Sequence, residues 1–165
     1  MNYHFDLCGD REKDDESFLE VFKALTHDCF SLKELYGLLA NLSVLIHSYL
    51  ENVNWCGFYI LEKDELFLGP FQGNIACETI KVGDGVCGTS VKEDCTMLVE
   101  DVNKFPGHIA CDESSRSEVV SPFYDNNGNI FGVIDWDSSI YSRFTQDDVI
   151  LIERISQIIS HSIKF

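Results

Sequence analysis

Three cysteines lie in segments whose composition suits thiol chemistry better than core packing. The motif Gly-x-Ile-Ala-Cys, followed by an acidic residue, occurs twice, at Cys77 and at Cys111. Cys111 lies in a stretch rich in glycine, serine and acidic residues, and Cys87 lies among three closely spaced glycines. Solvent and ligands can reach a thiol in such a loop, so all three are candidate redox cysteines. The alternative for each is a small buried hydrophobic residue, which is a common fate of a lone cysteine.

A second candidate feature is a set of acidic residues near the end of the chain. Asp135 and Asp137 are two residues apart in an expected strand, so both carboxylates face the same side and Trp136 faces the other. Two carboxylates this close raise the pKa of at least one of them unless a cation lies between them. The alternative for Asp135 and Asp137 is that both are solvated acids at a strand end. Glu118 is a further acidic candidate, and its alternative role is a surface ion pair with Arg116.

The hydrophobic pattern predicts helices at both ends of the chain and strands between them. Apolar residues at three- and four-residue steps indicate helices, whereas short aromatic and β-branched runs indicate strands. The expected helices are 17–29, 31–49, a short one at 86–91, and one that begins at Thr145. The expected strands are 54–61, 66–69, 79–82, 96–99, 118–124 and 129–136. The sequence therefore predicts an α+β fold in which a central antiparallel sheet of about six strands has the N- and C-terminal helices packed on one face. Residues 1–15 are expected to form a polar lead-in, and residues 16–165 a single domain.

Charge and composition exclude several classes of partner. The net charge of −16 disfavours binding to nucleic acid or to an anionic membrane surface. No apolar run approaches the ~20 residues of a membrane span, and the first residues do not resemble a signal peptide. Seven cysteines are an odd number in a chain of 165 residues, so a reducing, cytoplasmic setting is expected rather than a disulfide scaffold.

Several motifs together resemble one family, the free methionine-(R)-sulfoxide reductases, which are built on a GAF fold. The motifs are Asn-Trp-Cys-Gly-Phe-Tyr at 54–59, Gly-Pro-Phe-Gln-Gly at 69–73, Ile-Ala-Cys at 75–77, Gly-Val-Cys-Gly-Thr at 85–89, Phe-Pro-Gly-His-Ile-Ala-Cys-Asp at 105–112, Ser-Arg-Ser-Glu at 115–118 and Gly-Val-Ile-Asp-Trp-Asp-Ser at 132–138. The resemblance extends from about residue 17 to the C-terminus.

The resemblance implies a role for each matching residue. Cys111 matches the nucleophilic cysteine, Cys77 the principal resolving cysteine, and Cys87 a third cysteine that can assist regeneration. The residues that match the substrate pocket are Trp55, Glu118, Asp135 and Asp137. The remaining thiols lie outside the motifs and are expected to be incidental; they are Cys8, Cys29, Cys56 and Cys95.

The activity that the resemblance implies is reduction of free L-methionine-(R)-sulfoxide to L-methionine. It would proceed through a cysteine sulfenic acid and an intramolecular disulfide that thioredoxin reduces, with no metal or organic cofactor. The absence of a Cys-x-x-Cys pair also argues against a zinc site. The resemblance is consistent with a homodimer. The alternatives are a non-catalytic GAF-type small-molecule sensor and a thiol redox sensor.

Overall fold

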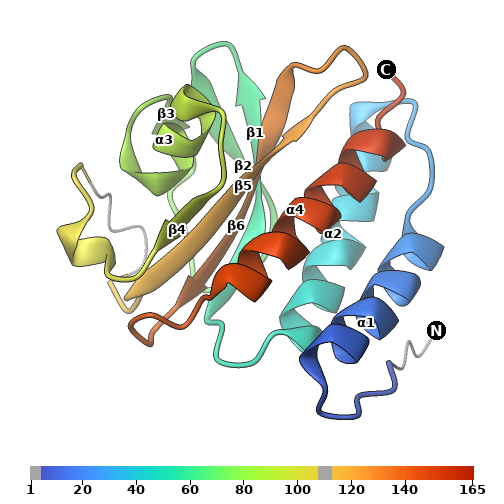
Figure 1. The fold of residues 1–165 in the computed structure, drawn as a ribbon. Helices are drawn as coiled ribbons and strands as arrows, with labels where there is room; N and C mark the ends of the chain where they lie inside the picture. The colour runs from blue at the N-terminus through green and yellow to red at the C-terminus, as the bar shows by residue number, and fades with distance from the viewer. Residues whose placement is uncertain (1–4, 108–112) are drawn as a thin grey trace.

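The computed structural model describes residues 5–107 and 113–165, and it contains one six-stranded antiparallel sheet in the order β3-β2-β1-β6-β5-β4 (Figure 1). The strands are β1 (Trp55–Glu62), β2 (Glu65–Gly73), β3 (Thr79–Lys81), β4 (Met97–Val99), β5 (Ser117–Tyr124) and β6 (Ile130–Ser138). The helices are α1 (Arg11–Leu25), α2 (Leu32–Tyr49), α3 (Gly85–Glu93) and α4 (Gln146–Ser162), with a short 3-10 helix at Val102–Lys104. The α+β fold class and its six strands are therefore confirmed.

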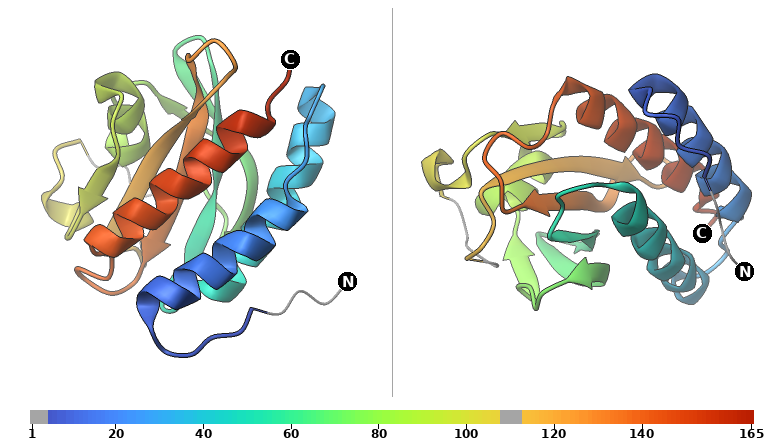
Figure 2. Two further views of the ribbon diagram at one scale, coloured as in Figure 1. Left: turned by 45° about the vertical axis from the view of Figure 1, so that its right-hand side comes forward. Right: turned by 90° about the horizontal axis from the view of Figure 1, so that it is seen from below.

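The sheet separates two hydrophobic cores because its side chains alternate between faces. On one face, α2 and α4 pack on the strands and α1 packs against both helices, as the sequence predicted (Figure 2). This larger core takes Phe58 from β1 and Trp136 from β6. On the other face, α3 covers a smaller core that takes Trp55 and Tyr59 from β1. The predicted site residues Trp55, Cys87, Glu118, Asp135 and Asp137 belong to this second face.

Helix α1 begins earlier than the sequence analysis expected. It starts at Arg11 rather than near residue 17, because the Asp10 side chain caps it by accepting from the Lys13 amide. Glu12 and Asp14 in the first turn favour this start through the helix dipole. The predicted lead-in of residues 1–15 is therefore wrong from Arg11 onward.

The second helix starts directly after Ser31, within one residue of the expected start. Ser31 Oγ accepts from the Glu34 amide at 3.3 Å, and Glu34 reaches back to the Phe30 amide at 2.7 Å. In the β5–β6 hairpin, Asp125 accepts from the Asn127 and Asn129 amides and so closes the turn. These local signals fix the ends of the elements.

Helix α3 is held close to the sheet edge by a glycine. A Cβ atom on Gly88 would lie 2.2 Å from the Lys81 carbonyl oxygen at the end of β3. Because only glycine allows this approach, α3 lies low enough for the side chain of Cys87 to be buried against the sheet.

Asp148, in the first turn of α4, is a buried carboxylate that joins three parts of the chain. It accepts from Arg11 at 3.0 Å, from Arg143 at 3.2 Å and from the Thr145 amide at 2.9 Å. The Thr145 hydroxyl completes a capping box. One side chain therefore pairs with two arginines and caps a helix.

Replacing Asp148 by alanine is expected to lower the free energy of unfolding by about 3 kcal/mol, because both arginines would lose their buried partner. Urea denaturation of the variant and of the parent protein measures this difference. The control is Asp28→Ala, which removes an exposed carboxylate 3.9 Å from Lys164 and should cost no more than about 0.5 kcal/mol. Equal losses in the two variants would contradict the role given to Asp148.

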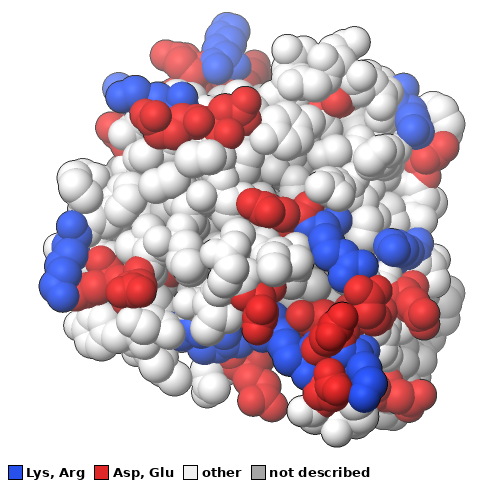
Figure 3. Space-filling view, viewed as in Figure 1, with Lys and Arg blue, Asp and Glu red and all other residues white. Residues whose placement is uncertain are grey.

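Charged side chains of both signs are interspersed on the face shown in Figure 3. Two ion pairs of the protein, Arg11 with Asp15 and Lys13 with Asp10, lie at the start of α1. Among the described residues, no helix combines the length and the apolar character that crossing a membrane requires.

Candidate functional site

Three neighbouring strands place the four predicted pocket residues on the face that α3 covers. Strand pairing puts Trp55 of β1 opposite Asp137 of β6, and Asp137 opposite Glu118 of β5. Asp135 lies two residues earlier on β6, on the same face. The structure therefore brings together Trp55, Glu118, Asp135 and Asp137, which lie in three separate segments of the sequence.

Cys87 joins this group from α3. Its Sγ donates to Asp135 Oδ2 at 3.2 Å and lies 4.0 Å from Glu118 Oε1. One ligand atom from each of the three side chains lies within 4.8 Å of the others. None of the three residues is more than 6% exposed. We call Cys87, Glu118 and Asp135 the buried acid–thiol cluster.

Burial is the main cause of the unusual electrostatics of this cluster. Burial raises the pKa of Asp135 from 3.8 to about 7, although hydrogen bonds with Cys87 and Glu118 work in the opposite direction. Burial, followed by the charge of Asp135, raises the pKa of Glu118 well above its usual range. The same two causes raise the pKa of the Cys87 thiol, so this thiol is protonated at neutral pH.

One aspartate has a raised pKa, as expected, but the cause differs from the expected one. The expected cause was repulsion between Asp135 and Asp137, whereas loss of solvent has the largest effect on Asp135. The alternative of two solvated acids is wrong for Asp135, which is buried, while Asp137 is half-buried. The alternative of a Glu118–Arg116 ion pair is also wrong, since Arg116 donates to backbone carbonyls of Glu113 and Ser115.

An aromatic wall borders the acidic residues on the β1–β2 side. The Trp55 ring stacks with Phe71 at 5.3 Å and with Tyr59 at 6.0 Å between ring centroids. Its Nε1 donates to the Asn74 carbonyl at 3.2 Å. A Cβ atom on Gly57 would lie 2.8 Å from the Trp55 ring, so this glycine makes room for the indole. Trp55 is thus both packed and fixed in orientation.

Cys77 lies beside this wall and is disulfide-bonded in the structure. It is half-buried, and the Tyr59 hydroxyl donates to its carbonyl oxygen at 3.0 Å. Ile75, two residues earlier, is 90% exposed, so this segment lies at the surface. Cys111, which matches the nucleophilic cysteine, lies outside the described residues.

Two residues of this site were not singled out from the sequence. Tyr59 holds the Cys77 segment, and Phe71 supports the Trp55 ring. The strand alternation could have indicated Tyr59, because it is four residues after Trp55 on the same strand. Phe71 comes from β2, and its position depends on the β1–β2 register.

The expectation that Trp136 faces away from the pocket is confirmed. Its ring is fully buried in the core on the helix side and lies 6.5 Å from the Phe144 ring. Cys56 lies on the same side, and its thiol donates to the Ser43 carbonyl at 3.4 Å. Cys29 is buried there as well, and its backbone forms an isolated parallel β-bridge with Ile163. These two thiols are therefore separated from the site by the sheet.

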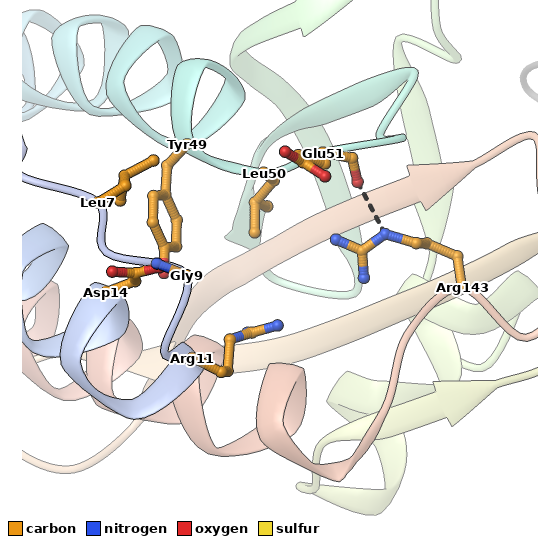
Figure 4. Close-up of a pocket in the computed structure, with 8 residues that line it drawn as sticks. All are labelled: Leu7, Gly9, Arg11, Asp14, Tyr49, Leu50, Glu51 and Arg143. Carbon is orange, nitrogen blue, oxygen red and sulfur yellow. Dashed lines mark hydrogen bonds between the residues drawn. The ribbon is translucent and has the colours of Figure 1, made fainter.

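A cavity of about 260 Å³ lies elsewhere, where the N-terminal segment meets α1, the end of α2 and the loop before α4 (Figure 4). Its lining residues are Leu7, Gly9, Arg11, Asp14, Tyr49, Leu50, Glu51 and Arg143. Arg143 donates to the Glu51 carbonyl, and both arginines pair with Asp148. Both guanidinium groups are thus engaged within the fold, and none of the predicted site residues that the structure describes lines this cavity.

Comparisons with known proteins agree with this arrangement. Residues 32–163 match the family model of the GAF domain. A free methionine-R-sulfoxide reductase of Escherichia coli is 54% identical over 110 residues, which cover 67% of this chain and 66% of that protein. A free methionine-R-sulfoxide reductase of Saccharomyces cerevisiae is 45% identical over 134 residues, covering 77% and 74%.

A solved structure extends the likeness to three dimensions. The free methionine-R-sulfoxide reductase of Neisseria meningitidis, in complex with its substrate, superimposes with a TM-score of 0.89 at 32% identity. The match covers 98% of this chain and 94% of that one. The chain therefore belongs to the GAF domain family and, within it, to the free methionine-R-sulfoxide reductases.

Proposed function

We propose that this protein is an oxidoreductase that reduces free L-methionine-(R)-sulfoxide to L-methionine. One observation carries the proposal: Trp55, Glu118, Asp135 and Asp137 lie together on one face of the sheet, beside the aromatic wall that also holds Cys77. A free amino acid needs a negative site for its ammonium group and an apolar surface for its methyl end. The acidic residues and the Trp55 ring provide these two features.

The proposed chemistry starts at Cys111. Its thiolate attacks the sulfoxide sulfur while a carboxyl group of the Glu118–Asp135 pair protonates the oxygen, so methionine leaves and Cys111 becomes a sulfenic acid. Cys77 then condenses with the sulfenic acid, which releases water and forms a disulfide. A thioredoxin-type dithiol reduces this bond by exchange and is itself oxidised to a disulfide.

The described cysteines support this pairing. Cys77 is disulfide-bonded, whereas the thiols of Cys8, Cys29, Cys56, Cys87 and Cys95 are free. For Cys87, the proposed part in regeneration requires the buried acid–thiol cluster to open, because a protonated, buried thiol is a poor nucleophile. Turnover needs no metal or organic cofactor in this scheme. The proposed location is a reducing cytoplasm, and the proposed assembly is a homodimer.

The test is a thioredoxin-coupled assay with separate R and S epimers, each free and within a peptide. We expect turnover of the free R epimer, and little with the S epimer or with either peptide. Faster reduction of peptide-bound substrate would contradict the proposal. Ligand binding without turnover would instead support a GAF-type sensor. Peroxide-driven disulfide formation without sulfoxide reduction would support a redox switch.

A further inference from the structure

The buried acid–thiol cluster has no positive partner in the part of the chain that the structure describes. The ion pairs of residues 5–107 and 113–165 include neither Glu118 nor Asp135. When both carboxyl groups are ionised, Asp135 Oδ1 is buried without a hydrogen-bond donor among these residues. Burying carboxylates without a counter-charge is costly, so the cluster favours a cation or a shared proton.

The spacing of the cluster fits a small divalent ion. Tetrahedral zinc, with bonds of about 2.1 Å to oxygen and 2.3 Å to sulfur, holds its ligand atoms roughly 3.4–3.6 Å apart. The Cys87 Sγ lies 3.2 Å from Asp135 Oδ2 and 4.0 Å from Glu118 Oε1, and all three ligand atoms fall within 4.8 Å. Shifts of a few tenths of an ångström to about one ångström would close the site, with water as the fourth ligand.

The ligand types select the ion. A thiolate favours zinc and similar thiophilic metals, whereas magnesium and calcium prefer sites made of oxygen alone. We propose that Cys87, Glu118 and Asp135 form a binding site for Zn²⁺ or a similar thiophilic divalent cation. On binding, the Cys87 S–H bond breaks, an Sγ–metal bond forms and the proton passes to solvent, with no change of oxidation state.

This ion would act as an inhibitor rather than as a cofactor. It would occupy the same carboxylates that we assign to the substrate ammonium and to the proton donor, so metal and substrate would compete. This consequence rests on the proposed function, whereas metal binding itself does not.

Cobalt titration tests the site directly, because a cobalt–thiolate bond has a characteristic charge-transfer absorption. The background variant is Cys8→Ser with Cys95→Ser, which removes the exposed free thiols of the described residues. The protein is kept with Cys77 disulfide-bonded, so that this cysteine cannot bind the metal. We expect one Co²⁺ per chain, displacement by Zn²⁺, and no displacement by excess Mg²⁺.

Variants of the cluster locate the ion. In this background, Cys87→Ser should abolish the absorption band, and Glu118→Gln, which keeps the thiol, should weaken binding by more than about 10-fold. The matched control is Cys56→Ser, which removes a buried thiol on the other face of the sheet and should leave the band unchanged. Circular dichroism checks that each variant is folded.

Two results would overturn the proposal: no thiolate band in the background variant, or an equal band in folded Cys87→Ser. The competition is read separately, as a rise in the apparent KM for free methionine sulfoxide when Zn²⁺ is added. If the protein proves to have no reductase activity, the spectroscopic result still decides whether the site binds metal.

Discussion

Serine at position 111 is expected to lower the turnover number by at least about 1,000-fold, because an alcohol cannot form the sulfenic acid that stores the oxygen. The coupled assay with the free R epimer measures this loss. The control is Cys95→Ser, since Cys95 is an exposed free thiol whose sulfur contacts Met97. Near-normal turnover in both variants would remove Cys111 from the mechanism.

A single-turnover experiment separates the roles of the two cysteines. Without reductant, Cys77→Ser should still release one equivalent of methionine, because its Cys111 can be oxidised once. Cys111→Ser should release none. A burst from Cys111→Ser and none from Cys77→Ser would mean that the nucleophile and the resolving cysteine have exchanged roles.

Asparagine at position 135 is expected to lower kcat/KM by about 100- to 10,000-fold, the usual contribution of a positioned proton donor. The pKa of Asp135 is raised to about 7, and Asp135 shares a hydrogen bond with Glu118, so the pair titrates together. Activity of the parent protein should therefore fall as pH rises above about 7, since the acid loses its proton. A pH–rate profile from 5 to 9 for both proteins tests this, and an unchanged profile in Asp135→Asn would contradict it.

The same substitution should have the opposite effect on stability. Because the pKa of Asp135 is raised on folding, from 3.8 to about 7, the folded protein binds more protons than the unfolded chain in this window. The carboxyl group therefore destabilises the fold increasingly as pH rises, by up to about 1.4 kcal/mol per pH unit. The free energy of unfolding of Asp135→Asn, relative to the parent, should rise between pH 4 and pH 7. Asp64→Asn, which removes an exposed carboxyl from the β1–β2 turn, is the control, and a falling difference would contradict the argument.

Local signals in the sequence predicted most of the elements. The Ser31 and Thr145 caps mark the starts of α2 and α4, and the turn at Asp125 marks the β5–β6 hairpin. The two-residue spacing of Asp135 and Asp137 placed both on one face. Such features depend on a few neighbouring residues, so they can be recognised without the fold. The start of α1 was missed because Asp10 and the first-turn acids were interpreted as a polar tail.

The electrostatics of the site could not be predicted in the same way. The resemblance to the reductases implied the roles of the cysteines and the pocket residues, but it did not indicate how deeply the Cys87 side chain is buried. The burial of Cys87 depends on the close contact between Gly88 and Lys81. The burial of Asp135 depends on the packing of α3 against β6. Both are long-range packing effects, which explains why repulsion was named as the cause of a shift that comes mainly from loss of solvent.

The chain contains two tryptophans, and the sheet separates them, one indole on each side. Trp136 is enclosed among apolar side chains, with no hydrogen bond to its Nε1 from the described residues, so its fluorescence emission should be blue-shifted and should report on global melting. Trp55 borders the acidic residues and is bonded to Asn74, so its emission should respond to occupancy of the site. The Trp55→Phe protein would thus keep only the fluorescence of Trp136, which reports on the helix-side core. The Trp136→Phe protein would keep only the fluorescence of Trp55, which reports on the site.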